Sequence, residues 1–547
     1  MSSPPRPPKE RPPADDPAPV EPLPSPDGIP DGTEAEAATA PRYGTGTSRQ
    51  MRRSQVRGSA LLVVGRIVTL LLTTATQVVI VRVLTQSDFG AFSYALALAA
   101  AGRTLLSLGQ GRLLSRFMAK YEEHQDYDRM FGAVLLAVGT IVVTSLVGLG
   151  LFLGFPDQLL NTADPATVQV VLILLLLAPL EALDQVFINI FAVFSAPGAI
   201  FFRKYLFTPG LRLAVVVALA LTGASVEFLA IGYVAAGLVG LVVSLGVLVR
   251  VLRERGLLEK LRPRRLRVPF KAVFSFSTPL LTGELLQLSL VVGGVLVLGY
   301  YQSAEEVATY RAVFNPSRLN TAVLGAFVPL FLPLAARLFE RRDIDGLRAA
   351  YWHTGALVAV LTFPVFALTG PLAHDLTLLL FGPRYSESAL VLALLSIGYY
   401  FNTALGFNAY TLQVCARLRF LVGVNVSVAV LNIGLSILLV PRYGAVAVAI
   451  ANLAALVVQN VLNQWALRSS IRTGFIDRSC LRCYLAIVAC AATLWVFQWT
   501  LRPGLLVGLV AATAASLVVL VVGRRAIELE ENFPELGRVP VLRWLLR

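Results

Sequence analysis

Seven charged side chains stand within long apolar stretches of this sequence, five of them deep, while Arg66 is shallower and Arg311 is about one turn from the predicted outer face. Four are arginines and three are carboxylates: Arg66, Arg103, Arg311, Arg318, Glu181, Asp184 and Glu284. A charge at the centre of a lipid bilayer costs about 2.5–3.5 kcal/mol even on insertion scales, so each requires a partner, an aqueous cavity or a function. Arginine suits phosphate because its guanidinium stays charged and donates hydrogen bonds in a fork. We therefore interpret the four arginines as candidate ligands for an anionic headgroup in a water-filled cavity.

The three carboxylates have two possible roles. They are candidate sites for a coupling proton or Na⁺, with Glu284 first and with Glu181 and Asp184 behind it. In the alternative interpretation, they pair with Arg103 and Arg318 and merely tie helices together. Another arginine, Arg212, lies close to a predicted helix end, and we expect its side chain to reach the membrane surface.

Two of the arginines follow a helical spacing. Arg311 and Arg318 are seven residues apart, which places them within about 20° on one face of an α-helix. Asn315 and Pro316 lie between them, and the proline removes the hydrogen bond to the carbonyl of residue 312. The spacing predicts a cationic ladder on a helix that bends where the ladder runs.

The surrounding sequence predicts an all-α polytopic membrane protein. Of its 547 residues, 56% are hydrophobic and only 15% are charged, and apolar runs of about 20 residues are long enough to cross a bilayer. We predict about fourteen transmembrane helices, near 57–84, 91–118, 130–154, 167–196, 204–222, 228–249, 270–298, 306–336, 349–370, 386–413, 419–440, 443–467, 482–500 and 504–523. We attribute the net charge of +14 to basic loops on one side of the membrane, and we expect no nucleic-acid partner.

The distribution of Lys and Arg predicts the orientation. Alternate loops and tails on one side hold 35 of these residues, whereas the other side holds only Arg82, Arg384, Arg442 and Arg502. This count assigns Arg203 and Lys204 to a loop on the basic side. The positive-inside rule then places both termini in the cytoplasm and the protein in the cytoplasmic (inner) membrane.

The chain divides into six predicted segments. Residues 1–56 form a cytoplasmic tail that we expect to be disordered, since positions 1–41 hold 13 of the 31 prolines and a net charge of −5. The others are an N-lobe (57–250), a basic cytoplasmic linker (251–269), a C-lobe (270–467), two further helices (468–523) and a cytoplasmic tail (524–547). The last eight residues are a candidate interfacial helix.

An internal repeat relates the two lobes. Five residues recur 216 positions later in equivalent helices or loops: Gln86, Ser87, Tyr94, Gly109 and Arg203 match Gln302, Ser303, Tyr310, Gly325 and Arg419. Six helices separate the copies, so both lobes have the same orientation and are related by an axis along the membrane normal. Arg103 lies one position from the repeat equivalent of Arg318. The pattern is typical of a carrier that works by alternating access.

Catalytic and metal motifs are missing from the sequence. It holds no P-loop, no G-x-S-x-G and no H-E-x-x-H, and its predicted outer loops are short, the longest being 370–386. Cys480 and Cys483 form a C-x-x-C in a predicted loop without a second ligand pair. We therefore expect a transporter rather than an enzyme, with no cofactor and no metal site.

Three short motifs resemble those of one family. Residues 82–90 (RVLTQSDFG) are similar to A-R-x-L-G-x-x-D-F-G, residues 381–385 (FGPRY) to F-G-x-x-Y, and residues 441–449 (PRYGAVAVA) to P-x-Y-G-x-x-G-A-A. Together they resemble the polysaccharide flippases, of O-antigen or teichoic-acid type, in the multidrug/oligosaccharidyl-lipid/polysaccharide exporter superfamily. Thr85 stands where that family usually has glycine.

The resemblance implies two six-helix lobes around a cavity that opens alternately to either face. It implies a lipid-linked glycan as substrate, typically an undecaprenyl-diphosphate oligosaccharide for cell-surface polysaccharide biosynthesis, with membrane lipids and polysaccharide synthesis proteins as further partners. Arg66, Arg103, Arg311 and Arg318 lie on helices that border the cavity in similar proteins. The count of fourteen helices also resembles lipid II flippases, in which the extra pair helps to form a groove for the lipid tail.

Three alternatives stay open. Lipid II is a second candidate substrate. A multidrug or cation antiporter of the same superfamily is a second candidate function, although carboxylates rather than arginines would then be expected in the cavity. A scaffold subunit of a polysaccharide synthase, acting through the proline-rich tail and the basic loops, belongs to another class.

Overall fold

The computed structural model describes residues 65, 68–107, 110–154, 165–194, 197–260, 266–268, 270, 284, 286–474 and 477–524. All of them belong to one compact unit, Arg57–Arg547. The N-terminal tail, Arg66, the C-terminal tail after residue 524 and the candidate interfacial helix lie outside the described residues. The described part of the chain is helical, with no strand in these ranges.

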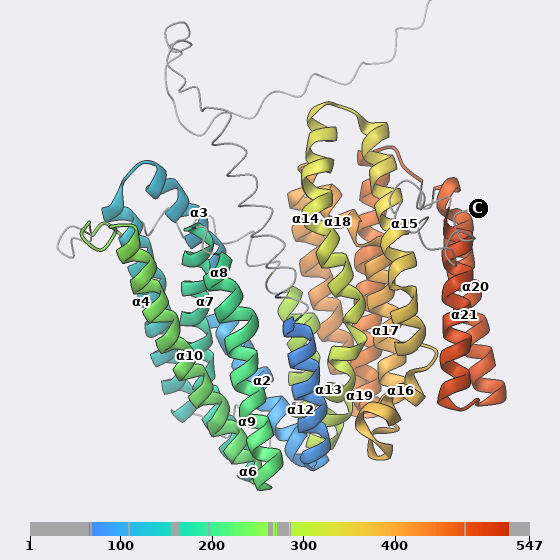
Figure 1. The fold of residues 1–547 in the computed structure, drawn as a ribbon, viewed down its shortest axis with the longest axis horizontal. Helices are drawn as coiled ribbons and strands as arrows, with labels where there is room; N and C mark the ends of the chain where they lie inside the picture. The colour runs from blue at the N-terminus through green and yellow to red at the C-terminus, as the bar shows by residue number, and fades with distance from the viewer. Residues whose placement is uncertain are drawn as a thin grey trace, which may run out of the picture. The chain divides into compact units, whose positions relative to one another are not determined.

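We call the helices up to Glu254 the N-lobe and those from Ser289 to Ser470 the C-lobe, following the predicted division (Figure 1). The N-lobe begins with an apolar helix, Val68–Val83. The other elements are α2 (Gln86–Ser107), α3 (Gln110–Glu123), α4 (Tyr127–Gly154), α6 (Pro165–Leu175), α7 (Leu177–Val193), α8 (Pro197–Ile200), the π-helix η1 (Phe201–Phe207), α9 (Thr208–Thr222) and α10 (Val226–Glu254). Helix α7 packs against α2, α3, α4 and α10, so residues on α7 lie at the centre of this group.

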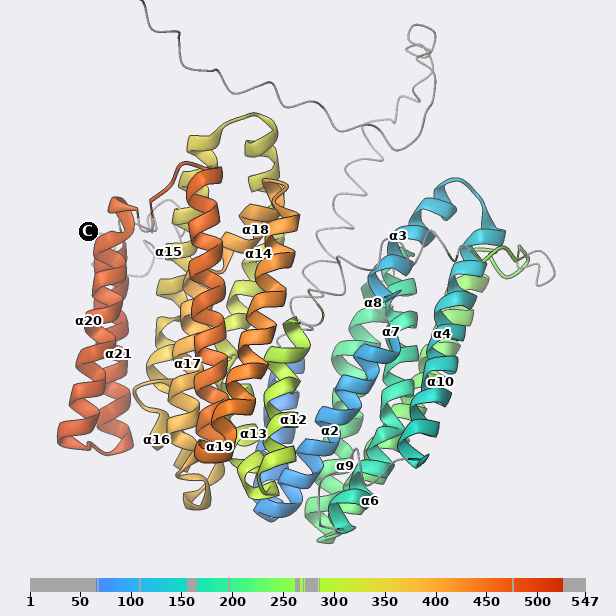
Figure 2. The same cartoon turned by 180° about the vertical axis from the view of Figure 1, so that it is seen from behind.

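The second group forms the C-lobe, and Figure 2 shows it from behind. Its elements are the π-helix η3 (Ser289–Gly293), α12 (Gly294–Tyr301), α13 (Ala304–Ser317), α14 (Leu319–Glu340), α15 (Ile344–Thr369), α16 (Ala373–Phe381), the 3₁₀ turn η4 (Pro383–Tyr385), α17 (Ser388–Leu405), α18 (Phe407–Val414) and α19 (Leu418–Ser470). Two further helices, α20 (Arg478–Leu501) and α21 (Leu505–Gly523), pack against each other and against α15.

Each of the fourteen predicted helices has a counterpart among the described helices. Eleven are long and apolar enough to cross a membrane, and two shorter apolar helices, Val68–Val83 and Leu286–Tyr301, accompany them. The longest of the eleven, α19, is two helices joined across a kink at Gly444, where φ is 50° and ψ is −131°. The predicted outer loop 370–386 is itself largely helical, as α16 and η4.

The kink at Gly444 depends on glycine for two reasons. Its positive φ is strained for a residue with a side chain, and a Cβ atom there would collide with the carboxylate of Glu306. That carboxylate accepts a hydrogen bond from the backbone N–H of Ala445 at 2.7 Å. The P-R-Y-G-A motif is therefore a helix-to-helix corner that α13 stabilises.

The two lobes meet along α2 and α13, which pack closely. At Gly90 a Cβ atom would collide with the backbone carbonyl of Ala304, so the absence of a side chain permits this approach. Near the start of α2, Arg82 donates to the carbonyls of Leu379 (2.6 Å) and Leu380 (2.9 Å) at the end of α16. Arg384 donates in return to the carbonyl of Val81, so each lobe caps a helix end of the other.

Candidate functional site

Helix α7 presents two carboxylates, Glu181 and Asp184, to the interior of the N-lobe. They are three residues apart and so share one face of the helix. The carboxylate of Glu181 holds two arginines from different helices: Arg212 Nη2 lies 2.6 Å from Oε1, and Arg103 Nη1 lies 3.5 Å from Oε2. The pairing proposed in the alternative interpretation is therefore present for Arg103. Arg212, which we expected to reach the membrane surface, is instead paired inside the lobe.

Asp184 belongs to a second, tighter pair. Arg203 Nη2 lies 2.9 Å from its Oδ1, and the Ser244 hydroxyl donates to the same oxygen at 2.6 Å. The Arg203 side chain is only 2% exposed, and it also donates to Ser244 Oγ at 2.5 Å and to Thr208 Oγ1. The assignment of Arg203 to a basic loop is therefore wrong: this arginine is part of the core.

Local backbone geometry brings Arg203 into the lobe. It lies in the π-helix η1, whose wider turn shifts side chains relative to a regular α-helix. Gly240 of α10 leaves the space for its guanidinium, since a Cβ atom there would collide with Arg203 Nη2. Hydropathy alone does not reveal a π-helix, so the inward position of the Arg203 side chain could not be predicted from the apolar pattern.

A cavity of about 150 Å³ opens beside these pairs. Six of its lining residues are charged: Arg103, Glu181, Asp184, Arg203, Lys204 and Arg212. The Arg103 side chain is 44% exposed, and it is the most accessible of the three paired arginines. This hollow is thus a polar site inside a membrane-spanning lobe.

The arginines of the C-lobe are held in a different way. The guanidinium carbons of Arg311 and Arg318 each lie 5.3 Å from the ring centre of Phe314, and that of Arg318 also lies 5.6 Å from the ring of Tyr399. Neither arginine forms an ion pair with any carboxylate in the described ranges. The Nε of Arg318 is buried and has no hydrogen-bond partner among those residues. Cation–π contact holds the two charges without neutralising them.

The expected break in this helix is present, and it lies at Arg318. Helix α13 ends at Ser317 and α14 begins at Leu319, while Arg318 has φ −94° and ψ 1°. The ladder geometry of a continuous helix therefore does not apply, but one ring, Phe314, still brings the two guanidinium groups together.

An N-lobe side chain satisfies the carbonyl that Pro316 leaves free. The amide of Gln77 donates to the carbonyls of Arg311 and Ala312, both at 2.8 Å, and it accepts a hydrogen bond from Asn315 Nδ2. The carbonyl of Ala312 is the one that a residue other than proline at 316 would use. Gln77 thus links the lobes at the helix turn that carries Arg311.

Glu284 and Arg66 complete the set of predicted site residues. Glu284 is helical and half-buried, shortly before η3. Arg66 lies outside the described residues. The roles of both residues stay predictions.

Similarity to known proteins identifies the family of this chain. Residues 55–339, more than half of the chain, match the model of the family described as "Polysaccharide biosynthesis protein". The chain belongs to this family. The resemblance drawn from the three short motifs is thereby confirmed.

A curated relative and two solved structures extend this result. Over 202 residues the chain is 25% identical to an uncharacterized membrane protein of Methanocaldococcus jannaschii, a match that spans 35% of this chain and only 38% of that protein. The fold is similar to that of the lipid II flippase MurJ in an inward closed conformation, with a TM-score of 0.66 and 13% identity over 86% of this chain and 100% of that one. It is also similar to an inward-facing MATE multidrug transporter, with a TM-score of 0.57 and 14% identity over 75% and 99% of the two chains.

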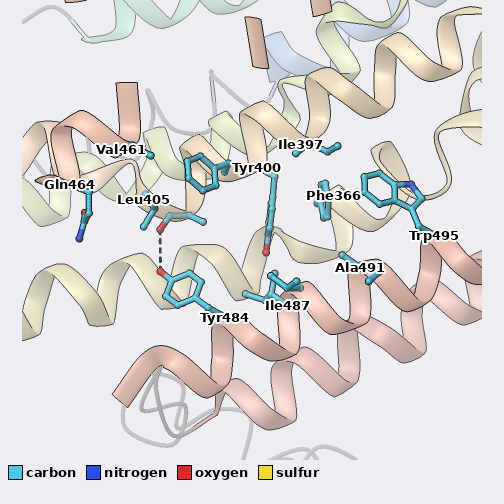
Figure 3. Close-up of a pocket in the computed structure, with 14 residues that line it drawn as sticks. Phe366, Ile397, Tyr400, Leu405, Val461, Gln464, Tyr484, Ile487, Ala491 and Trp495 are labelled. Atoms are coloured by element: carbon cyan, nitrogen blue, oxygen red, sulfur yellow. Dashed lines mark hydrogen bonds between the residues drawn. The ribbon is translucent and has the colours of Figure 1, made fainter. Parts of the chain in front are cut away.

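Helix α20, the first of the last two helices, borders a second hollow. An apolar groove of about 530 Å³ lies between α15, α17, α19 and α20, lined by residues such as Phe366, Tyr400, Tyr484 and Trp495 (Figure 3). Tyr484 donates to the carbonyl of Ala404 at 3.2 Å across one end of it. The groove and the charged cavity therefore differ in chemistry and lie in different lobes.

The predicted loop position of the C-x-x-C motif is wrong. Cys480 and Cys483 lie within α20, and both are buried and form no disulfide in the described part of the chain. Cys483 packs close to Gly523 of α21, so it contributes to the contact between the last two helices.

Proposed function

We propose that this protein is a flippase that moves a lipid-linked oligosaccharide of the undecaprenyl-diphosphate type across the cytoplasmic membrane by alternating access. It would serve cell-surface polysaccharide biosynthesis. The family match, which covers polysaccharide biosynthesis proteins, and the fold shared with a lipid II flippase support this proposal.

One observation carries the choice of substrate. Arg311 and Arg318 present two guanidinium groups beside one ring in a membrane-spanning helix, and no carboxylate in the described part of the chain neutralises either of them. An unpaired charge in that environment is costly, so an anionic ligand that completes it gains the most there. A diphosphate offers several oxygens to two adjacent forks. A cationic drug would meet repulsion at the same place, which disfavours the antiporter function.

The groove beside α20 provides a place for the lipid tail. Its lining is almost wholly aromatic and aliphatic, and burial of a polyprenyl chain there would let the sugar and diphosphate cross inside the protein. Lipid II carries the same kind of tail and headgroup charge, so it remains the second candidate substrate.

Glu284, Glu181 and Asp184 are the candidate coupling carboxylates of such a cycle. Glu181 and Asp184 hold arginine partners, so Na⁺ or H⁺ coupling at either of them would require this pairing to open.

A transport assay tests the proposal. The purified full chain is placed in liposomes that contain a fluorescent undecaprenyl-diphosphate oligosaccharide, and exposure of the glycan to an outside quencher is followed over time. We expect movement with wild type, none with protein-free liposomes, and much slower movement with Arg318→Gln. If wild type moves a cationic dye down an ion gradient but not the glycan, the antiporter function replaces the flippase.

A second comparison tests the scaffold function. Deletion of residues 1–41 should leave glycan movement in liposomes and surface polysaccharide in cells unchanged. Loss of polysaccharide in cells with normal movement in liposomes would show that the tail recruits a synthase.

A further inference from the structure

We propose that the charged cavity of the N-lobe is an oxyanion-binding site, distinct from the α13 arginines, that takes a phosphate or carboxylate group of the transported glycan. This inference rests on the proposed function and adds to it a second anionic contact. The site comprises Arg103 of α2, Glu181 and Asp184 of α7, Arg203 and Lys204 of η1, and Arg212 of α9.

The charge balance of the cavity favours an anion. The described lining residues include three arginines and only two carboxylates. Asp184 is committed to Arg203, because Arg203 is buried and Ser244 bonds to both of them. What remains is one carboxylate, that of Glu181, shared between Arg103 and Arg212. A second anion would complete this incomplete pairing, whereas a cation would add to the excess positive charge.

The geometry of Glu181 leaves room for such a ligand. Its two oxygens hold different arginines, so the guanidinium groups face the cavity from two helices, α2 and α9. Arg212 also lies over the ring of Tyr233, with its guanidinium carbon 5.3 Å from the ring centre, and its Nε is buried without a partner among the described residues. Two fixed forks beside one open volume are the arrangement that binds a tetrahedral or planar oxyanion.

The volume agrees with this ligand class. A cavity of about 150 Å³ holds a phosphate or a sugar carboxylate with a few waters, and it is too small for an oligosaccharide. Arg103, whose side chain is 44% exposed, provides the accessible end at which an anionic substituent would enter. The rest of the glycan would therefore remain outside this hollow.

The test uses two variants, and neither of them leaves a carboxylate at position 181 without a cationic partner. Arg212→Gln removes one cation and leaves Glu181 paired with Arg103. The double variant Glu181→Gln/Arg212→Gln removes a cation and an anion together, so the net charge of the site is that of wild type. Initial rates of glycan movement are measured in liposomes with two lipid diphosphates, one bearing neutral sugars and one bearing a uronic acid.

We expect Arg212→Gln to slow movement about five- to tenfold, the loss of one charge-assisted contact in a partly solvated site, and the double variant, which lacks the same contact, to be slowed as well. Slowing of both glycans identifies the diphosphate as the ligand, and slowing of the acidic glycan alone identifies the sugar carboxylate. An unchanged rate in Arg212→Gln overturns the proposal. Recovery of the rate in the double variant also overturns it, because the single variant then acts only through the charge imbalance of the network.

A binding measurement separates this inference from the proposed function. In an Arg311→Gln/Arg318→Gln background, which removes the α13 arginines, inorganic pyrophosphate should raise the unfolding temperature, and the further substitution Arg212→Gln should abolish this shift, whether or not the glycans move. If wild type moves neither glycan but the Arg311→Gln/Arg318→Gln protein shows this shift, the flippase assignment fails and the anion site stands. If the shift is the same in both proteins, the anion site fails.

Discussion

The two lobes hold their intramembrane arginines in opposite ways. In the N-lobe, Arg103, Arg203 and Arg212 each lie on a carboxylate of α7. In the C-lobe, Arg311 and Arg318 lie on aromatic rings and have no carboxylate partner in the described ranges. Ion pairing lowers the cost of a charge inside the membrane, so the arginines of α13 have more to gain from an external anion than the paired arginines of the N-lobe. The difference indicates that the two lobes contribute unequally to anion binding, with the stronger contact at α13.

The repeat pair Arg203 and Arg419 shows the same division at equivalent positions. Arg203 is buried in η1 and bound to Asp184, whereas Arg419 is exposed at the start of α19. Identical residue types at one repeat offset therefore do not imply identical roles, because Arg203 lies against a carboxylate while Arg419 is exposed.

The largest expected effect is on stability and concerns the N-lobe. Arg203→Gln leaves the carboxylate of Asp184 partly buried without its cation, a change that costs about 3–5 kcal/mol. We expect little folded protein by size-exclusion chromatography in detergent. Asp184→Asn/Arg203→Gln should recover much of the yield, because it removes both charges. Normal yield of the single variant would mean that this arginine is not structural.

The second effect is on transport and concerns the C-lobe. Arg318→Gln should lower glycan movement about tenfold to a hundredfold, as expected for one charge-assisted hydrogen bond of about 1.5–3 kcal/mol. Its unfolding temperature should equal that of wild type, because no described carboxylate loses a partner. Arg103→Gln, which removes a cation already shared with Glu181, should have the smaller effect. A reversed order would break the comparison between the lobes.

The third effect concerns the link between the lobes. Gln77→Leu leaves the carbonyls of Arg311 and Ala312 without their donor, at a cost of about 1–3 kcal/mol. We expect a lower unfolding temperature and weaker glycan affinity, because the helix turn that carries Arg311 loses its anchor. Gln77→Glu, which keeps an acceptor for Asn315 and loses the two donors, should resemble Gln77→Leu. A response of stability alone would limit Gln77 to a structural role.

The smallest effect concerns the rings. Phe314→Leu removes the face that Arg311 and Arg318 share, a contact of about 0.5–2 kcal/mol, and should weaken glycan affinity a few-fold. Tyr233→Leu, beneath the already paired Arg212, should change affinity less at a comparable loss of stability. Equal changes in both variants would mean that the rings serve only packing.

Hydropathy and charge predicted the helices of this fold because each span must exclude charges and satisfy its own backbone. The same reasoning did not predict the ion pairs. Arg212 was expected to be shallow because its helix was predicted to start at 204, whereas the helical run begins at Pro197 and places Arg212 well inside. The π-helix that turns Arg203 inward and the reach of Gln77 between lobes depend on contacts distant in sequence.

The most direct test of the account measures glycan binding rather than movement. Purified wild type, Arg103→Gln and Arg311→Gln/Arg318→Gln are placed in nanodiscs and titrated with an undecaprenyl-diphosphate oligosaccharide. We predict that the double variant loses about a hundredfold or more in affinity at an unchanged unfolding temperature, the sum of two charge-assisted contacts, while Arg103→Gln loses much less. Wild-type affinity in the double variant would contradict the claim that the unneutralised arginines of α13 bind the headgroup.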